Sequence, residues 1–344
     1  MTTELSILST LTERNALAPI QTLIPEVQSD KSAKKALPPN YVQKTVTIVG
    51  IKRTTARFLP VSHEGDSNET YVDKVEVLEN SRAEFIARKL KAIERREHMR
   101  LFRSLTEQER GGVWKDHFKT WFGRPCEIPN ELCTLCWNDS LFGSLETDKV
   151  KAATFSRIRY FDTYSVEPAE DCIARLGSEE GIAVGNTVAE NLSKARGDSS
   201  LHYYEYVKPD THFPFITVIE NATLLDIVGL LNAISAADAR GYGKYSASSG
   251  KFDTEVLAVS TGVPRFSVLT MLEWAKEDDR PSAQGLDRIR DAFKPDAPVS
   301  IRARFEDNVR GEAGTLWGPQ SDGLRGLLRR EFESYVAALD HSKA

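Results

Sequence analysis

The stretch YVQKTVTIVGIKRTTAR, residues 41–57, combines a strand pattern with a basic end. Val42, Val46 and Ile48 share one parity, whereas most positions between them are polar. An alternation of period two is typical of a strand with one buried face. The pattern therefore predicts a strand over residues 41–51, with one polar face, that delivers several cations to its end.

Outward from this strand, the pattern predicts a mixture of strands and helices. Further strands are expected at residues 71–78, 154–161, 213–219 and 255–261. A capping box from Ser81 to Glu84 predicts the start of one helix, and Thr223 with Asp226 predicts the start of a strongly apolar second helix. The last predicted helix places its apolar residues between Leu324 and Leu339 at helical spacing.

This order predicts an α+β fold with a ferredoxin-like (RRM-like) core, a βαββαβ unit interrupted by insertions. We expect an N-terminal extension at residues 1–40, which ends in a Pro-Pro linker, and a core made of residues 41–80 and 141–262. A glycine-rich insertion at residues 177–206 interrupts the second part of the core. A helical and cysteine-bearing insertion is predicted at residues 81–140, and a C-terminal helical region at residues 263–344.

Composition and charge restrict the class of protein. Of 344 residues, 40% are apolar and 28% are charged, which is typical of a globular chain. No apolar run approaches the ~20 residues that span a bilayer, and no signal peptide is recognised, so a cytoplasmic protein is expected. The net charge of −5 argues against a generally basic nucleic-acid binder, but residues 82–124 alone hold 12 Lys and Arg against 6 Asp and Glu.

Three of the four cysteines lie within eleven residues, as Cys126, Cys133 and Cys136. A C-x2-C pair allows both thiolates to reach one tetrahedral zinc ion, and a third cysteine seven residues earlier fits a closing loop. The sequence therefore predicts a structural zinc site, with buried thiols as the alternative. The candidates for a fourth ligand are His117, Asp139 and Cys172.

A loop at residues 240–251, RGYGKYSASSGK, has the composition of a loop that grips a nucleic-acid backbone. Glycines allow the main chain to approach phosphates, lysines supply charge, and tyrosines can stack on bases. If the predicted strands are neighbours, their cations would line one open sheet face, the usual place for reading single-stranded RNA. The alternatives are a solvated surface loop and ordinary charges at the edge of a sheet. Across the loop and the strands, the candidate RNA-binding residues are Lys52, Arg53, Arg57, Arg157, Arg159, Tyr242, Gly243, Lys244 and Lys251.

Catalytic motifs are absent from the sequence. The six histidines form no HExxH pattern, and there is no P-loop and no G-x-S-x-G motif. We therefore expect a protein that is not an enzyme. Cleavage of RNA without a metal would need a general base, and His63 is the candidate for that role.

An ordered set of short motifs resembles one known family. Cys133-x2-Cys136 is followed by Leu-Phe-Gly at residues 141–143 and by Phe-Asp-Thr-Tyr-Ser at residues 161–165. Tyr-Val-Lys-Pro at residues 206–209, the apolar helix and the glycine-rich loop complete the set. It resembles the RNA-binding backbone subunit, of the Cas-seven branch of the RAMP superfamily, in type I-D CRISPR surveillance (Cascade) complexes. The resemblance covers about residues 41–275. It departs at Asp139, where the family tends to carry a further cysteine, and in a glycine-rich loop that holds fewer arginines.

The resemblance implies a subunit that polymerises in several copies along one CRISPR RNA, beside other effector subunits, and presents the guide for pairing with a target nucleic acid. Residues 177–206 would be a thumb that reaches the neighbouring copy, with Ile182 and Val184 at its tip. The alternatives are the backbone subunit of a type IV complex, a RAMP endoribonuclease that processes precursor RNA, and a structural zinc module without an RNA role.

Overall fold

The fold was analysed in a computed structural model. It describes residues 3–25, 43–60, 69–127, 131–146, 152–176, 203–244, 246–276, 283–294 and 322–342. Helices and antiparallel sheets are interleaved along the chain, so the predicted α+β class is confirmed. Within the described ranges, no helix is long and apolar enough to cross a membrane.

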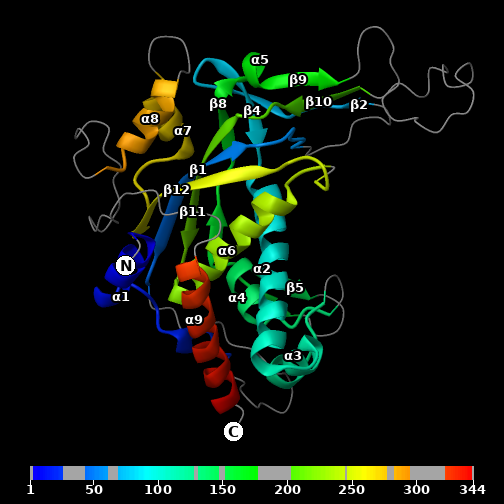
Figure 1. The fold of residues 1–344 in the computed structure, drawn as a ribbon, viewed down its shortest axis with the longest axis vertical. Helices are drawn as coiled ribbons and strands as arrows, with labels where there is room; N and C mark the ends of the chain where they lie inside the picture. The colour runs from blue at the N-terminus through cyan, green and yellow to red at the C-terminus, as the bar shows by residue number, and fades with distance from the viewer. Residues whose placement is uncertain are drawn as a thin grey trace, which may run out of the picture.

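The central sheet has four strands in the order β12-β1-β11-β7, all antiparallel to their neighbours. β1 spans Val46–Thr54, β7 Ile158–Tyr160, β11 His212–Ile219 and β12 Phe252–Thr261. Helix α2 (Ala87–Arg110) lies between β1 and β7 in the chain, and α6 (Leu224–Arg240) lies between β11 and β12. The chain thus passes through these six elements in the βαββαβ order, with other elements inserted between them (Figure 1).

Both faces of the central sheet are buried. Val46 and Ile48 belong to a large core that includes residues of α2, α6 and α9 (Asp322–His341). Val49 and Ile51, on the other parity, pack with α7 (Val268–Ala275) and α8 (Ala283–Asp291). The expectation of a polar, open sheet face for RNA is therefore wrong, because two C-terminal helices cover it (Figure 1). Any nucleic-acid surface must lie at the ends of the strands or on the helices.

The predicted helix start at Ser81 is also wrong. Residues Asn80–Phe85 form β4, which pairs with β3 (Lys74–Val77) and with β8 (Thr163–Pro168). The capping-box motif does not start a helix here, because Ala83 and Phe85 are both buried in one cluster. Residues two positions apart share a face in a strand but not in a helix. α2 begins at Ala87, whose amide donates to Asp162 Oδ1 at 2.7 Å.

A second small sheet has the order β2-β10-β9. β2 is Glu69–Thr70, β9 is Ile173–Leu176 and β10 is Tyr203–Val207. β9 and β10 pair antiparallel, so the segment expected to be a thumb leaves and returns at adjacent strands. Its predicted tip, Ile182 and Val184, lies outside the described residues.

The cysteine-bearing segment forms regular elements. α3 (Trp114–Phe122) and α4 (Trp137–Phe142) are followed, beyond the predicted boundary at residue 140, by the hairpin of β5 (Ser144–Glu146) and β6 (Ala152–Thr154). A single helical turn, α5 (Ala169–Cys172), links β8 to β9.

The N-terminal segment packs into the main core. α1 (Thr3–Glu13) and the 3-10 helix η1 (Ile20–Leu23) contribute Ile7, Leu11 and Leu23 to the large core cluster that also contains residues of α9. The described part of the predicted extension is therefore an integral part of the fold.

Candidate functional site

One corner of the molecule joins the end of β1 to the glycine-rich loop. The amide of Gly250 donates to the carbonyl of Arg57, and the amide of Lys244 donates to the carbonyl of Leu59. Beneath them, Phe58, Tyr242 and Leu90 of α2 share one buried cluster. The structure thus brings together two of the segments that the sequence marked for RNA contact.

Gly243 is required by this geometry. Its φ is +75°, and a Cβ at this position would lie 2.3 Å from the carbonyl oxygen of Leu59. Lys251 completes the loop, because its ammonium donates to the carbonyls of Arg240 at 2.6 Å and Ser246 at 2.7 Å. The loop is therefore closed by its own lysine, which has fewer donors left for a ligand than the sequence implied.

Arg53 and Arg57 are exposed at this corner but have different surroundings. Arg53 pairs with Asp210 at 3.2 Å and with Asp253 at 3.0 Å. The Arg57 guanidinium lies over the Tyr206 ring, 4.9 Å from its centroid. Arg53 is therefore already neutralised, whereas Arg57 offers an aromatic-backed cation to an anionic ligand.

Lys52 and Tyr242 lie inside the protein, with exposed fractions of 1% and 0%. The Lys52 ammonium contacts Asp238 at 3.2 Å and Glu94 at 3.4 Å, and donates to the Tyr242 hydroxyl at 3.0 Å. Tyr242 in turn donates to Glu94 at 2.9 Å, and Tyr160 does so at 2.7 Å. The prediction of a surface role for these two side chains is corrected: they join β1, α2, α6 and the loop from within.

The electrostatics of this network follow from burial. Desolvation raises the pKa of Asp238 above its ordinary value, although Lys52 opposes the rise. Burial, followed by the nearby Glu94 carboxylate, raises the pKa of both Tyr160 and Tyr242 well above 10. Both phenols therefore remain protonated donors to Glu94.

Arg157 is buried as well, whereas Arg159 is exposed. Arg157 makes a bidentate pair with Asp226 at 2.9 and 3.0 Å and also donates to the carbonyl of Asn221. Burial alone would raise the pKa of Asp226, but Arg157 holds it below its usual value. Arg159 pairs with Glu220. The two arginines therefore do not form the shared basic face that the sequence analysis expected.

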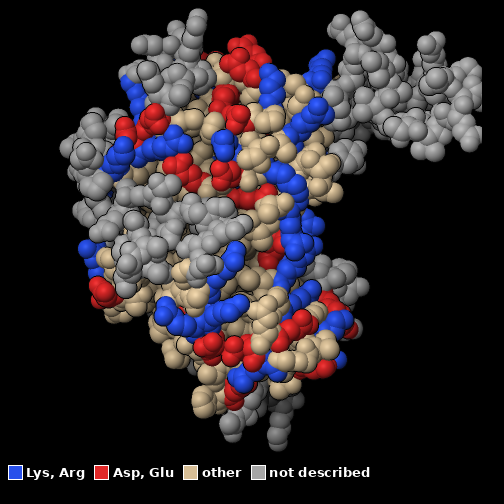
Figure 2. Space-filling view, in the orientation of Figure 1, with Lys and Arg blue, Asp and Glu red and all other residues tan. Residues whose placement is uncertain are grey.

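Six Lys and Arg lie between Arg88 and Arg100 of α2 and make up the basic face of this helix. In the structure its two nearby acids, Glu94 and Glu97, are turned inward, with exposed fractions of 1% and 5%. The side chains of Arg88, Lys89 and Arg96 form no ion pair or hydrogen bond within the described part of the chain. Figure 2 shows the resulting column of Lys and Arg along α2. This face is strongly positive because Glu94 and Glu97 point inward, and helical spacing alone does not predict that direction.

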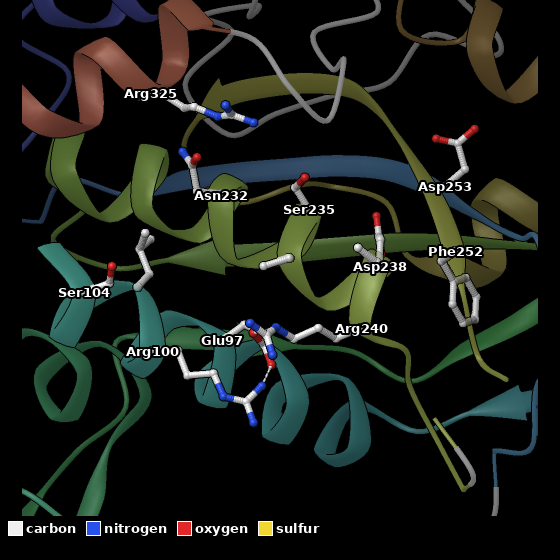
Figure 3. A pocket seen from close by; sticks show the side chains of 13 residues that line it. Glu97, Arg100, Ser104, Asn232, Ser235, Asp238, Arg240, Phe252, Asp253 and Arg325 are labelled. Carbon is white, nitrogen blue, oxygen red and sulfur yellow. Dashed lines mark hydrogen bonds and ion pairs between the residues drawn. The ribbon is translucent and has the colours of Figure 1, made fainter. Parts of the chain in front are cut away.

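A cavity of about 570 Å³ lies between α2, α6, β12 and α9. Arg100 and Arg240 converge on Glu97 at its floor, and Arg240 Nε lies 2.9 Å from Glu97 Oε2 (Figure 3). Asp238 and Asp253 also line it. Because acids accompany the arginines, this cavity is less suited to phosphate than the α2 surface is.

The candidate metal site is a buried cluster in the cysteine-bearing insertion. One ligand atom from each of Cys126, Cys133, Cys136 and Asp139 lies within 4.8 Å of the others. The Cys126 and Cys136 sulfurs are 3.7 Å apart, close to the edge of about 3.8 Å in a tetrahedron with 2.3 Å zinc–sulfur bonds. Three thiols and a carboxylate therefore fit a four-coordinate zinc ion.

Asp139 supplies the fourth group, and the other two candidates do not. His117 bonds the carbonyl of Gly111, and Cys172 contacts Ser165 in a different cluster. Hydrogen bonds from Cys133 and Cys136 lower the pKa of the Cys126 thiol to about 3, and burial with the Cys126 charge raises that of Asp139 to about 7. The cluster thus stabilises a thiolate, the form that binds metals.

Comparison with known proteins supplies the remaining evidence. Residues 33–308 match the family model described as Csc2 Crispr. The crystal structure of Thermofilum pendens Csc2 has 14% sequence identity and a TM-score of 0.53, with 86% of this chain and 88% of that chain covered. Two CRISPR RNA-guided surveillance complex structures, one of them pre-nicking, match with TM-scores of 0.43 and 0.39 at 12% and 13% identity. They cover 72% and 71% of this chain, and 86% and 80% of theirs. No curated protein matches the chain.

These findings define the class first: this is a CRISPR protein of the Cas-seven type. Within that class the chain belongs to the Csc2 family, whose model covers most of its length. The family indicated by the ordered motifs is therefore confirmed, and the type IV alternative is set aside. At 14% identity the Thermofilum structure supports the fold alone.

Proposed function

We propose that this chain is a non-catalytic, sequence-independent RNA-binding backbone subunit of a CRISPR surveillance complex. In this role several copies polymerise along one guide RNA, and base pairing by the guide selects the target. The observation that carries the proposal is a set of α2 cations, Arg88, Lys89 and Arg96, that have no partner among the described residues. They lie on the helix that packs against the Arg57 corner.

The physical reason is the nature of the ligand. Contacts to phosphates supply affinity without reading sequence, and they come from exposed Lys and Arg that are not already neutralised. The two acids between Arg88 and Arg100, Glu94 and Glu97, are buried, so they do not repel a polyanion at this part of the α2 surface. Membership in the Csc2 family supports the same role.

The cysteine cluster supports a structural zinc ion in this function. Four protein ligands would complete a tetrahedral site and leave no open position for a substrate, as catalytic zinc requires. When bound, the ion would hold α4 and the loop before it in place, through Cys126, Cys133, Cys136 and Asp139.

The decisive experiment is salt-dependent binding of the full chain to fluorescein-labelled oligouridine. The triple variant Arg88→Ala, Lys89→Ala, Arg96→Ala should bind more weakly and lose about 0.7 in log–log salt slope per lost phosphate contact. Arg329 and Arg330 of α9, both exposed, supply a control as a double alanine variant, which removes two cations from a surface away from α2. An unchanged slope in the triple variant, with its fold intact, contradicts the proposal.

A precursor-processing nuclease remains the alternative from another class. His63, its candidate base, lies outside the described residues. We expect wild type and His63→Ala to leave precursor CRISPR RNA equally intact; cleavage by wild type that His63→Ala abolishes would overturn the non-catalytic assignment.

A further inference from the structure

Phe155 lies beside the basic face of α2, and neither the fold nor the proposed function described above involves its side chain. Phe155 is 90% exposed, an unusual environment for a large apolar ring. We propose that Phe155 is a stacking platform for a base of single-stranded RNA whose phosphates lie along α2. This inference rests on the proposed function and adds to it a contact with a base.

Phe155 lies directly after the β5–β6 hairpin, on a surface that is apolar. In the hairpin, Leu145 pairs with Ala153, and Phe155 is two residues further along. Leu145 is 66% exposed and Ala153 is exposed too. Such a surface marks a contact site for a ligand or partner, so its neighbours must decide which.

Those neighbours are cations of α2. Lys91 Nζ donates to Ser156 Oγ at 2.7 Å. Since Ser156 follows Phe155 in the chain, this hydrogen bond holds the Phe155 segment against the basic face of α2. Arg95, one turn further along α2, pairs with Asp139 of the same insertion. Burial, followed by the charge of Arg95, lowers the pKa of Lys91. An exposed ring beside such a cationic row fits a nucleotide, which presents a π-face and an anion together.

The platform is held rigidly from behind. Ser156 Oγ donates to the Ile158 carbonyl at 2.7 Å, and Arg157 is fixed by its bidentate pair with Asp226. Gly143 allows the close approach of this segment, because a Cβ there would lie 2.9 Å from the Ser156 nitrogen. A pre-positioned ring loses little conformational entropy when a base stacks on it.

A second exposed ring lies near the start of the same helix. Phe161 is 43% exposed, and its neighbour Asp162 accepts from the amide of Ala87, the first residue of α2. Two aromatic side chains therefore flank the first turns of α2, with Arg88 between their points of attachment. This arrangement favours a nucleic acid over an uncharged apolar partner.

The test measures binding of the full chain to oligouridine and to an oligonucleotide carrying 2-aminopurine, whose fluorescence falls on stacking. Phe155→Ala should weaken binding by about 5- to 150-fold without changing the salt slope, because stacking is worth roughly 1–3 kcal/mol per base. Phe155→Trp should retain affinity and quenching, whereas Phe155→Leu should lose both. Leu269→Ala, at an exposed leucine of α7 outside this surface, is the control and should bind as wild type does.

The outcomes separate the inference from the function on which it rests. If wild type binds and the α2 triple variant weakens, but Phe155→Ala binds normally, the stacking site is disproved and the RNA-binding function stands. Full rescue by Phe155→Leu overturns stacking in favour of a simple apolar contact. Loss of self-association in Phe155→Ala with unchanged RNA binding would instead assign the surface to a second copy of the chain. If wild type binds no RNA, both proposals fail.

Discussion

Arg95 of α2 donates from Nη2 to Oδ1 of Asp139 at 2.9 Å, while Oδ2 of the same carboxyl group lies 3.2 Å from the Cys126 sulfur. One carboxylate therefore joins the cysteine cluster to the basic helix. Asp139 itself is fully buried, so its charge depends on these partners. The insertion that could hold a metal is thus connected directly to the surface that we propose binds RNA.

The first prediction concerns the metal. Protein purified without chelators should contain about one equivalent of zinc, and Cys133→Ser, Cys136→Ser should lose it and unfold more readily, because such sites contribute to folding free energy. Asp139→Cys should keep the metal, since a thiolate is an equally competent ligand. Elemental analysis and thermal unfolding provide the measurements. Wild-type protein free of zinc even after refolding with added zinc would contradict the prediction.

The second prediction compares two neighbouring cations of β1. Lys52→Met should lower the free energy of unfolding by about 3–5 kcal/mol, because it leaves Glu94 and Asp238 buried without their counter-charge. Arg53→Met is the matched control: its ion pairs are exposed, and such pairs contribute about 0–1 kcal/mol. Urea unfolding measures both. Equal losses in the two variants would show that the buried network does not stabilise the fold.

Much of the core could be predicted from sequence because its signals are local. In β11, residues 213–219 are all buried and, except for Thr217, apolar. Thr223 and Asp226 form the predicted capping box of α6. For such elements, periodicity and caps agree with the tertiary packing, so the local pattern is sufficient.

The candidate site was harder to predict because its decisive partners are distant in sequence. The buried Lys52 pairs with Asp238, 186 positions away, and the buried Arg157 pairs with Asp226, 69 positions away. The sequence does not distinguish a Lys or Arg that binds a phosphate from one that pairs with a buried carboxylate. The glycine-rich loop is similar: its tyrosine at 242 was expected to stack on a base and instead donates to Glu94. Only the fold distinguishes these two environments.

The third prediction concerns acid stability. His98 is fully buried, and desolvation lowers its pKa from 6.5 to about 3. Asn138 donates to its Nδ1 at 3.0 Å, so the folded state favours a neutral ring. The unfolded chain therefore binds a proton that the folded chain excludes. Between pH 6.5 and about 3, the free energy of unfolding should fall by up to about 1.4 kcal/mol per pH unit because of this residue.

His98→Gln removes this titration. Its free energy of unfolding, although lower at pH 7, should fall less steeply between pH 6.5 and 5 than that of wild type. His341→Gln, at an exposed histidine near the end of α9, serves as the control. Parallel profiles for wild type and His98→Gln would be inconsistent with a neutral, buried His98.

The last prediction separates Arg57 from Arg53 as contacts for RNA. Arg57→Ala should weaken oligouridine binding and lower the log–log salt slope by about 0.7, because it removes a cation that pairs with no carboxylate of the described residues. Arg53 already pairs with Asp210 and Asp253, so the charge-conserving double variant Arg53→Ala, Asp253→Asn should leave the slope close to that of wild type. Arg57→Lys should keep the slope and lose part of the affinity, because a lysine retains the charge but stacks less well on Tyr206. Anisotropy titrations across a salt series measure all three. If the double variant loses slope and Arg57→Ala does not, the phosphate contact belongs to Arg53 and the RNA path over this corner must be redrawn.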